Sequence, residues 1–309
     1  RLLVRLKQTA QVNDQATCGI WQEQHSLSSA LTEAQSPRQR EADTWSRVLA
    51  MQCLFPPSST ALTSRSSFDE LVDFVGKSVE RVKEYYIQLR SSAFAASSRF
   101  PMTNGHVRAA QLVLEYASEA FVGEHMGSIN RLIEYCFEAV TSTLHLLADL
   151  KEGVTLDVVD SVDDELDIGT SWVNPGALGA NGIFSSTRHV SQEEKMRRYQ
   201  SQSLLIGSWL LTREACAFLS TAIMLPSVSP DTSVASKCAT VLMDALVSLK
   251  HSGAAFAAHR TFSTLVAKYF AIDSAVPIGW TIRVLDEIVN HDRIHDSTLR
   301  RSTGFALGT

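Results

Sequence analysis

The sequence contains no long uninterrupted run of apolar residues, although hydrophobic residues fill 45% of its 309 positions. No stretch approaches the roughly 18 residues that indicate a membrane-spanning helix, so none is expected. The strict alternation of apolar and polar residues that marks half-buried strands is also nearly absent. We therefore expect an all-helical chain that is long enough to bury a sizeable core.

Cysteine is scarce, and its spacing follows no known framework. The five cysteines are scattered and form no Cys-x-x-Cys motif: Cys18, Cys53, Cys136, Cys216 and Cys238. An odd number without close spacing argues against a disulfide framework or a zinc site. We expect buried free thiols in a cytoplasmic protein, and no metal.

Positive charge is in deficit, since 28 Lys and Arg residues face 33 Asp and Glu residues. This formal net charge of −5 argues against a simple nucleic-acid coat. The balance is uneven, because residues 1–190 hold 16 basic and 23 acidic residues, whereas residues 191–309 hold 12 and 10. A polyanion-binding surface is therefore expected toward the C-terminal end, although ordinary scatter of charge would also produce this difference.

Helical periodicity suggests three regions in what we interpret as a fragment of a longer chain. Residues 1–150 are predicted to form N-terminal helical repeats, with helices around Trp45, from the capping-box sequence Ser67-Phe68-Asp69-Glu70 onward, over about 106–122 and over about 128–150. Residues 151–190 combine clustered aspartates with several glycines, and we expect a long acidic and glycine-rich loop. Residues 191–309 are predicted to form helices over about 191–223, 233–250, 254–271 and 279–290.

Successive amphipathic helices with short links favour helical hairpins stacked into a HEAT/armadillo-like solenoid. A compact helical bundle is the structural alternative.

Few motifs indicate chemistry. The glycines between Gly176 and Gly182 lack the preceding strand of a nucleotide-binding fingerprint. The segment His291-Asp292-Arg293-Ile294-His295 has the histidine spacing of a zincin helix, but it has Asp in place of the catalytic Glu and no clear third ligand. We therefore expect no catalytic residue, no metal site and no cofactor.

Arg300-Arg301-Ser302 is the strongest candidate for ligand binding. Two neighbouring guanidinium groups and a hydroxyl can bind phosphate through charge-assisted hydrogen bonds. A basic cap near a helix end would give the same sequence.

The C-terminal 120 or so residues resemble the central region of the THADA family. Arg300-Arg301-Ser302-Thr303-Gly304-Phe305-Ala306 is similar to the family signature Arg-Arg-Ser-Ala-Gly-Leu-Pro, with Arg300, Arg301, Ser302 and Gly304 matching. Lys250-His251-Ser252-Gly253-Ala254 resembles the family's Lys-His-Arg-Gly-Ala segment. Trp209 with Arg213-Glu214 resembles its Trp-x-x-x-Lys-Glu helix.

The resemblance implies a long HEAT/armadillo-like protein that is the regulatory partner of a tRNA 2′-O-ribose methyltransferase. It implies that the two proteins together methylate nucleotide 32 of the anticodon loop. The methyl donor, S-adenosylmethionine, and the catalytic residues would belong to the methyltransferase. Lys250, His251, Arg300, Arg301, Ser302 and Gly304 become the candidate tRNA-binding or motif residues. A general HEAT-type protein scaffold without RNA is the alternative function, and an enzyme in its own right is a third.

Overall fold

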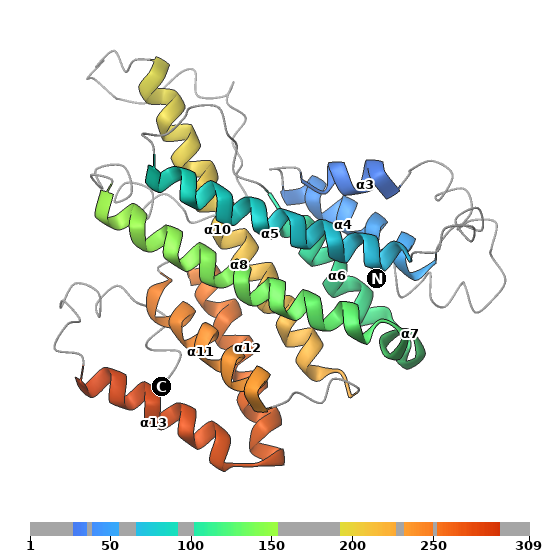
Figure 1. Ribbon diagram of the computed structural model, residues 1–309, viewed down its shortest axis with the longest axis vertical. Helices are drawn as coiled ribbons and strands as arrows, with labels where there is room; N and C mark the ends of the chain where they lie inside the picture. Colours follow the sequence, from blue (N-terminus) through green and yellow to red (C-terminus); the bar gives the residue numbers. More distant parts are fainter. Residues whose placement is uncertain are drawn as a thin grey trace, which may run out of the picture.

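The computed structural model describes residues 27–35, 39–55, 66–91, 102–153, 192–226, 232–249 and 252–290. Every regular element in these ranges is a helix, which confirms the all-α prediction there (Figure 1). The helices are α3 (Leu27–Glu33), α4 (Gln39–Leu54), α5 (Ser67–Ser91), α6 (Asn104–Tyr116), α7 (Glu119–Glu124), α8 (Met126–Gly153), α10 (Gln192–Met224), α11 (Thr232–Ser248), α12 (Ser252–Ile272) and α13 (Ala275–Asn290). The predicted loop over 151–190 lies outside the described residues except at its start, where α8 continues to Gly153.

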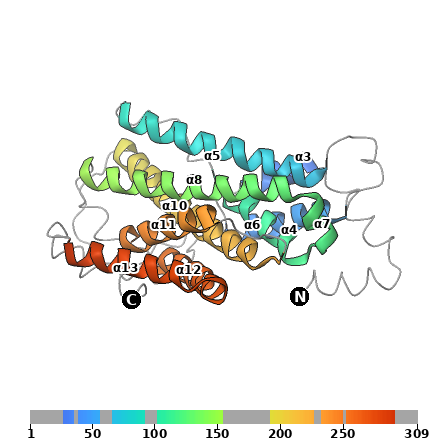
Figure 2. The ribbon, with the colours of Figure 1, turned by 60° about the horizontal axis from the view of Figure 1, so that its bottom comes forward.

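The main helices lie in two rows. The first row consists of α4, α6, α10 and α12, each in contact with the next. The second row consists of α5, α8, α11 and α13, likewise in contact one after another. Contacts such as α8 with α10 and α11 with α12 join the rows. Figures 1 and 2 both show α5 and α8 side by side, with α11 and α13 following.

Neighbouring helices within a row run parallel where side-chain contacts define their register. Between α5 and α8, Asp73 bonds Arg131 and Lys83 bonds Glu138, at nearly constant separations of 58 and 55 residues. Between α10 and α12, two contacts share a separation of 45 residues. A constant separation in sequence requires that both helices advance in the same direction.

The core lies between the two rows. On α8, Ile129, Leu132, Cys136 and Val140 are all buried, and their steps of three and four residues place them on one face of the helix. The central helix α10 contacts α6, α8 and α12, so its buried residues face several neighbours. This explains why α10 has a broader apolar surface than one amphipathic stripe.

The predicted free thiols are confirmed for four of the five cysteines. Cys53, Cys136, Cys216 and Cys238 are buried and unbridged. Burial raises the pKa of each of these thiols, that of Cys216 to about 12. Such thiols remain protonated and act as small apolar core groups. Cys18 lies outside the described residues.

Two local predictions need correction. The helix expected over 106–122 is two helices, because α6 ends at Tyr116 and α7 begins at Glu119. Ser118 caps α7 by accepting a hydrogen bond from the Phe121 amide at 3.2 Å. The capping residue of α5 is Ser66 rather than Ser67. The Ser66 hydroxyl accepts from the Asp69 amide at 3.1 Å and donates to the Asp69 carboxylate at 2.8 Å.

The start of α6 lies close against the end of α3. A Cβ atom added at Gly105 would lie 2.3 Å from the Ala34 carbonyl oxygen, so only glycine permits this approach. The next residue, His106, is fully buried, stacks on Phe74 at 4.5 Å, and places Nε2 2.7 Å from the Leu31 carbonyl. Since a carbonyl can only accept, Nε2 carries the proton.

Candidate functional site

Helix α10 presents one stripe of partly exposed side chains on the solvent side of the first row. Trp209, Arg213 and Ala217 follow one another at steps of four residues, and each is partly buried. This stripe includes the Trp-x-x-x-Arg-Glu segment, so the structure describes that motif in full. It lies between α6 and α12, the two neighbours of α10 in its row.

Trp209, Arg213 and Glu214 form one interacting group. The guanidinium carbon of Arg213 lies 5.8 Å from the centroid of the Trp209 ring, within the range of a cation–π contact. The Nε and Nη2 atoms of Arg213 both donate to Oε1 of Glu214, at 2.9 and 2.5 Å. The Glu214 side chain is only 8% exposed, against 27% for Arg213. The arginine therefore neutralises a buried carboxylate while part of its own surface stays accessible.

Hydrogen bonds from α6 and α12 fix the position of α10 along its own axis, which is called its height below. Thr261 of α12 donates to the Cys216 carbonyl at 2.6 Å, and Lys268 donates to the Ile223 carbonyl at 2.5 Å. Gln111 of α6 donates to Thr221 at 3.3 Å. Within the first row, α10 is therefore held by hydrogen bonds from both of its neighbours.

The six residues predicted as tRNA-binding or motif residues lie outside the described residues: Lys250, His251, Arg300, Arg301, Ser302 and Gly304. The residues that flank Lys250 and His251 are described. Leu249 ends the segment after α11, Ala254 lies in the first turn of α12, and both are buried in the core. The motif around Lys250 therefore connects two packed helices of opposite rows.

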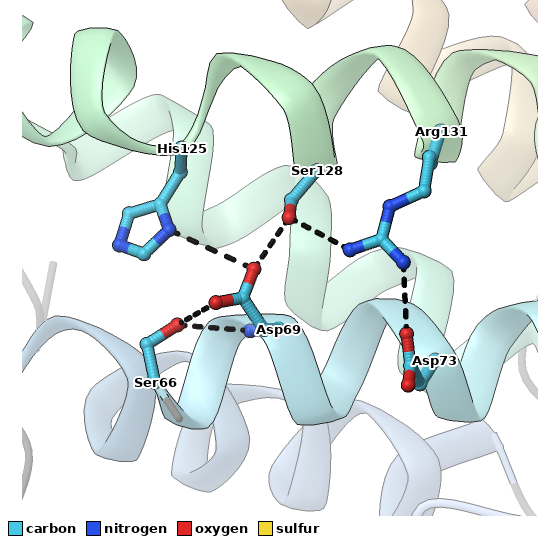
Figure 3. Close-up of polar contacts among 6 residues, drawn as sticks. All are labelled: Ser66, Asp69, Asp73, His125, Ser128 and Arg131. Carbon is cyan, nitrogen blue, oxygen red and sulfur yellow. Dashed lines mark hydrogen bonds and ion pairs between the residues drawn. The ribbon is translucent and has the colours of Figure 1, made fainter. Parts of the chain in front are cut away.

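A second polar group joins the starts of α5 and α8 (Figure 3). Asp69 accepts hydrogen bonds from Ser66 and Ser128, and its Oδ1 lies 3.8 Å from Nδ1 of His125. Arg131 donates to Ser128 and to Asp73, each at 3.0 Å. Only Ser66 in this group could have been found from the sequence, because it lies one residue before the predicted cap Ser67. Ser128 and Arg131 are 59 or more residues from Asp69, so no local pattern connects them to it.

This group contains Ser, His and Asp, but it does not have the geometry of a nucleophilic triad. In such a triad the serine hydroxyl bonds the histidine, which acts as its base. Here both serine hydroxyls donate to the aspartate instead (Figure 3). Partial burial acts to raise the pKa of Asp69, but hydrogen bonds from Ser128 and Ser66 and the charges of His125 and Arg131 outweigh it and lower that pKa. The arrangement holds a carboxylate in its charged form and joins two helices.

Within the described part of the chain, no group of three or more His, Cys, Asp or Glu side chains could hold a metal ion. None of the helices in these ranges is both long enough and apolar enough to span a bilayer.

In the residues that the structure describes, these features define an all-helical protein built from two rows of helices, with one polar group on the central helix α10 of the first row and another between α5 and α8 of the second. A family model described as THADA/TRM732, DUF2428 matches residues 127–308, which covers α8, α10, α11, α12 and α13. The chain belongs to this family. No curated protein and no solved structure matched the chain.

The family is regulatory rather than catalytic, and it is linked to partnership with tRNA methyltransferases. Membership therefore points to a role related to tRNA modification. The matched range includes Trp209, Arg213 and Glu214 and also the six predicted motif residues.

Proposed function

We propose that this chain is a non-catalytic scaffold, the regulatory subunit that positions tRNA for 2′-O-ribose methylation of anticodon-loop nucleotide 32 by a partner methyltransferase. The match to the THADA/TRM732 family over residues 127–308 carries the proposal. Because tRNA processing of this kind uses a separate enzyme, the methyl donor would bind to the partner. We place the complex in the cytoplasm.

The architecture is suited to holding two macromolecules at once. Parallel helices within each row, joined row to row by antiparallel hairpins, are the arrangement of a HEAT/armadillo-like solenoid, and we propose that α4 to α13 form a segment of one. A solenoid offers a long surface of fixed shape. Holding a ribose hydroxyl near the methyl donor converts binding energy into orientation, which can lower the barrier by several kcal/mol, on the order of 7–11 for well-oriented reactants.

Reconstitution tests the proposal. The full-length protein and its co-purified methyltransferase are incubated with unmodified tRNA and S-adenosylmethionine, and methylation at nucleotide 32 is read by mass spectrometry. We expect methylation only when both proteins are present. Methyl transfer by this protein alone would identify it as an enzyme, and full activity of the methyltransferase alone would exclude a positioning role.

A general protein scaffold without RNA binding is the competing function. It is favoured by large apolar side chains exposed on the last two helices, including Phe256, Phe270 and Ile278. Salt-dependent binding of tRNA by the intact protein separates the two, because phosphate contacts release counterions and protein–protein apolar contacts do not.

A further inference from the structure

The two rows of helices differ in charge. The helices of the first row, α4, α6, α10 and α12, contain nine Lys and Arg residues against six Asp and Glu. The helices of the second row, α5, α8, α11 and α13, contain eight against twelve. The first row is therefore net positive by three and the second net negative by four, in a chain whose overall charge is −5.

Carboxylates pair with three of the eight cations of the second row, Lys83, Arg131 and Lys237. Lys83 bonds Glu138 and Glu80 at 2.7 and 2.8 Å. Arg131 bonds Asp73, and Lys237 bonds Glu134 of α8. These ion pairs join α5 and α11 to α8, so the three cations are neutralised within the protein and are less available to an external anion.

Cations of the first row have different partners. Arg108 of α6 donates at 2.6 Å to the neutral amide of Gln111, and Arg260 of α12 is exposed. Neither of these two arginines has a carboxylate partner among the described residues. Arg213 does pair with Glu214, but its guanidinium also lies over Trp209 and remains partly exposed.

Arg213 and Arg260 lie at similar heights on adjacent helices, and Arg108 lies beside the C-terminal half of α10. The register of α10 and α12 places residue 258 beside Arg213, because bonded residues are 45 apart. Arg260 is two residues further along, or about 3 Å at the α-helical rise. Arg108 is one turn from Gln111, which bonds Thr221 on the C-terminal half of α10.

We propose that the solvent side of the first row, at Arg108, Arg213 and Arg260, contacts the sugar–phosphate backbone of the tRNA. This rests on the proposed function and assigns the RNA to one row of the scaffold. Guanidinium groups suit phosphate because their planar forks can donate two hydrogen bonds to one group. Adjacent helices of a row are about 8–10 Å apart, so three arginines on α6, α10 and α12 can follow several phosphates of one strand. The acidic second row would repel the same backbone.

Charge-matched variants of the two rows provide the test. Arg108→Gln/Arg260→Gln removes two cations from the first row, and Lys77→Gln/Arg81→Gln removes two exposed cations of α5 from the second. Arg213 is left intact because it neutralises Glu214. Binding of tRNA to the full-length protein is measured across a range of KCl concentrations, with melting temperatures as a check on folding.

We expect the first-row variant to bind tRNA roughly ten-fold more weakly near physiological salt, with the slope of log K against log salt reduced by about 1–2. The second-row variant should retain most of the wild-type affinity and slope. Equal losses in both variants would overturn the assignment, because they would indicate diffuse attraction. Unchanged tRNA binding with lost capture of the methyltransferase would also overturn it and would make this face a protein interface.

The wild-type protein reports separately on the proposed function. If it binds tRNA and supports methylation while the first-row variant is unaffected, only the surface assignment fails. If the wild type neither binds tRNA nor supports methylation, the scaffold function itself is wrong and the surface assignment falls with it.

Discussion

Arg213 lies over the ring of Trp209, one turn further along α10, while its guanidinium donates twice to the carboxylate of its neighbour Glu214. The arginine thus connects an aromatic ring on the solvent side to a carboxylate that is almost fully buried. Both contacts are made within a single helix.

Replacing Arg213 tests how much the buried carboxylate depends on it. Arg213→Ala leaves the Glu214 charge without its partner, and we expect a loss of about 2 kcal/mol in the free energy of unfolding. Arg213→Lys retains the charge but not the two-pronged donor, so it should cost less than about 1 kcal/mol. Urea denaturation measures both. Equal stability of the alanine variant and the wild type would show that Glu214 does not need this neutralisation.

The cap of α5 gives a second test. Ser66→Ala removes the hydroxyl that bonds the Asp69 amide and carboxylate, so it should lower the free energy of unfolding by about 1 kcal/mol. Ser67→Ala is the matched control, because that residue is the first of the helix and does not supply the cap. It should be nearly neutral in the same denaturation experiment. A larger loss for Ser67→Ala than for Ser66→Ala would contradict the observed register.

Long, regular apolar spacing allowed the main helices to be predicted closely. The helix expected over about 128–150 spans Met126–Gly153, and the one expected from 191 to 223 spans Gln192–Met224. Burial of one stripe decides such helices, and sequence spacing reports it directly. The predictions that failed did so at helix ends, where hydrogen bonds from single side chains set the boundary. Ala117 and Phe121 continue the helical period, yet Ser118 caps a new helix between them.

The side-chain contacts could not be predicted from the sequence. Ser66 and Ser67 both begin a pattern that fits a capping box, and only the observed bonds to Asp69 identify Ser66 as the cap. Ser128 joins that cluster from 59 residues away, which no local pattern encodes. For the candidate site, the sequence identifies Trp209 and Arg213 as part of one motif, but their position on the net-positive row depends on the fold. The tRNA role of Arg300 and Arg301 stays a prediction.

Glycine at position 105 should be essential for docking of α3. In Gly105→Ala the new methyl group would meet the Ala34 carbonyl, a backbone atom that cannot rotate away, so we expect a cost of about 1–3 kcal/mol. Because α3 is short and peripheral, the loss should appear as faster hydrogen exchange over residues 27–35. Gly127→Ala is the control, since nothing lies within 4 Å of its added Cβ. It should be neutral or slightly stabilising, and similar exchange in both variants would refute the close contact.

His106 should make the fold sensitive to acid. Burial of its ring outweighs the opposing effect of the Leu31 and Thr103 carbonyls and lowers its pKa from 6.5 to about 4. In the folded protein Nε2–H donates to Leu31, and a second proton, on Nδ1, would place a positive charge in the core, away from water. The unfolded chain therefore takes up a proton at higher pH than the folded one.

The sign of the effect follows from this difference. Above pH 6.5 the histidine is neutral in both states and its contribution to stability is complete. As the pH falls from 6.5 to 4, only the unfolded state gains a proton, and stability should decrease by about 3 kcal/mol. Below pH 4 this decrease ends, and the lowered pKa of Asp69 begins to contribute its own loss of stability.

Urea denaturation at several pH values measures the free energy of unfolding against pH for the wild type and for His106→Gln. The variant cannot titrate at this position, so its curve should be flatter between pH 6.5 and 4, whatever its absolute stability. Parallel curves for the two proteins would show that His106 is protonated as readily in the folded state as in the unfolded one.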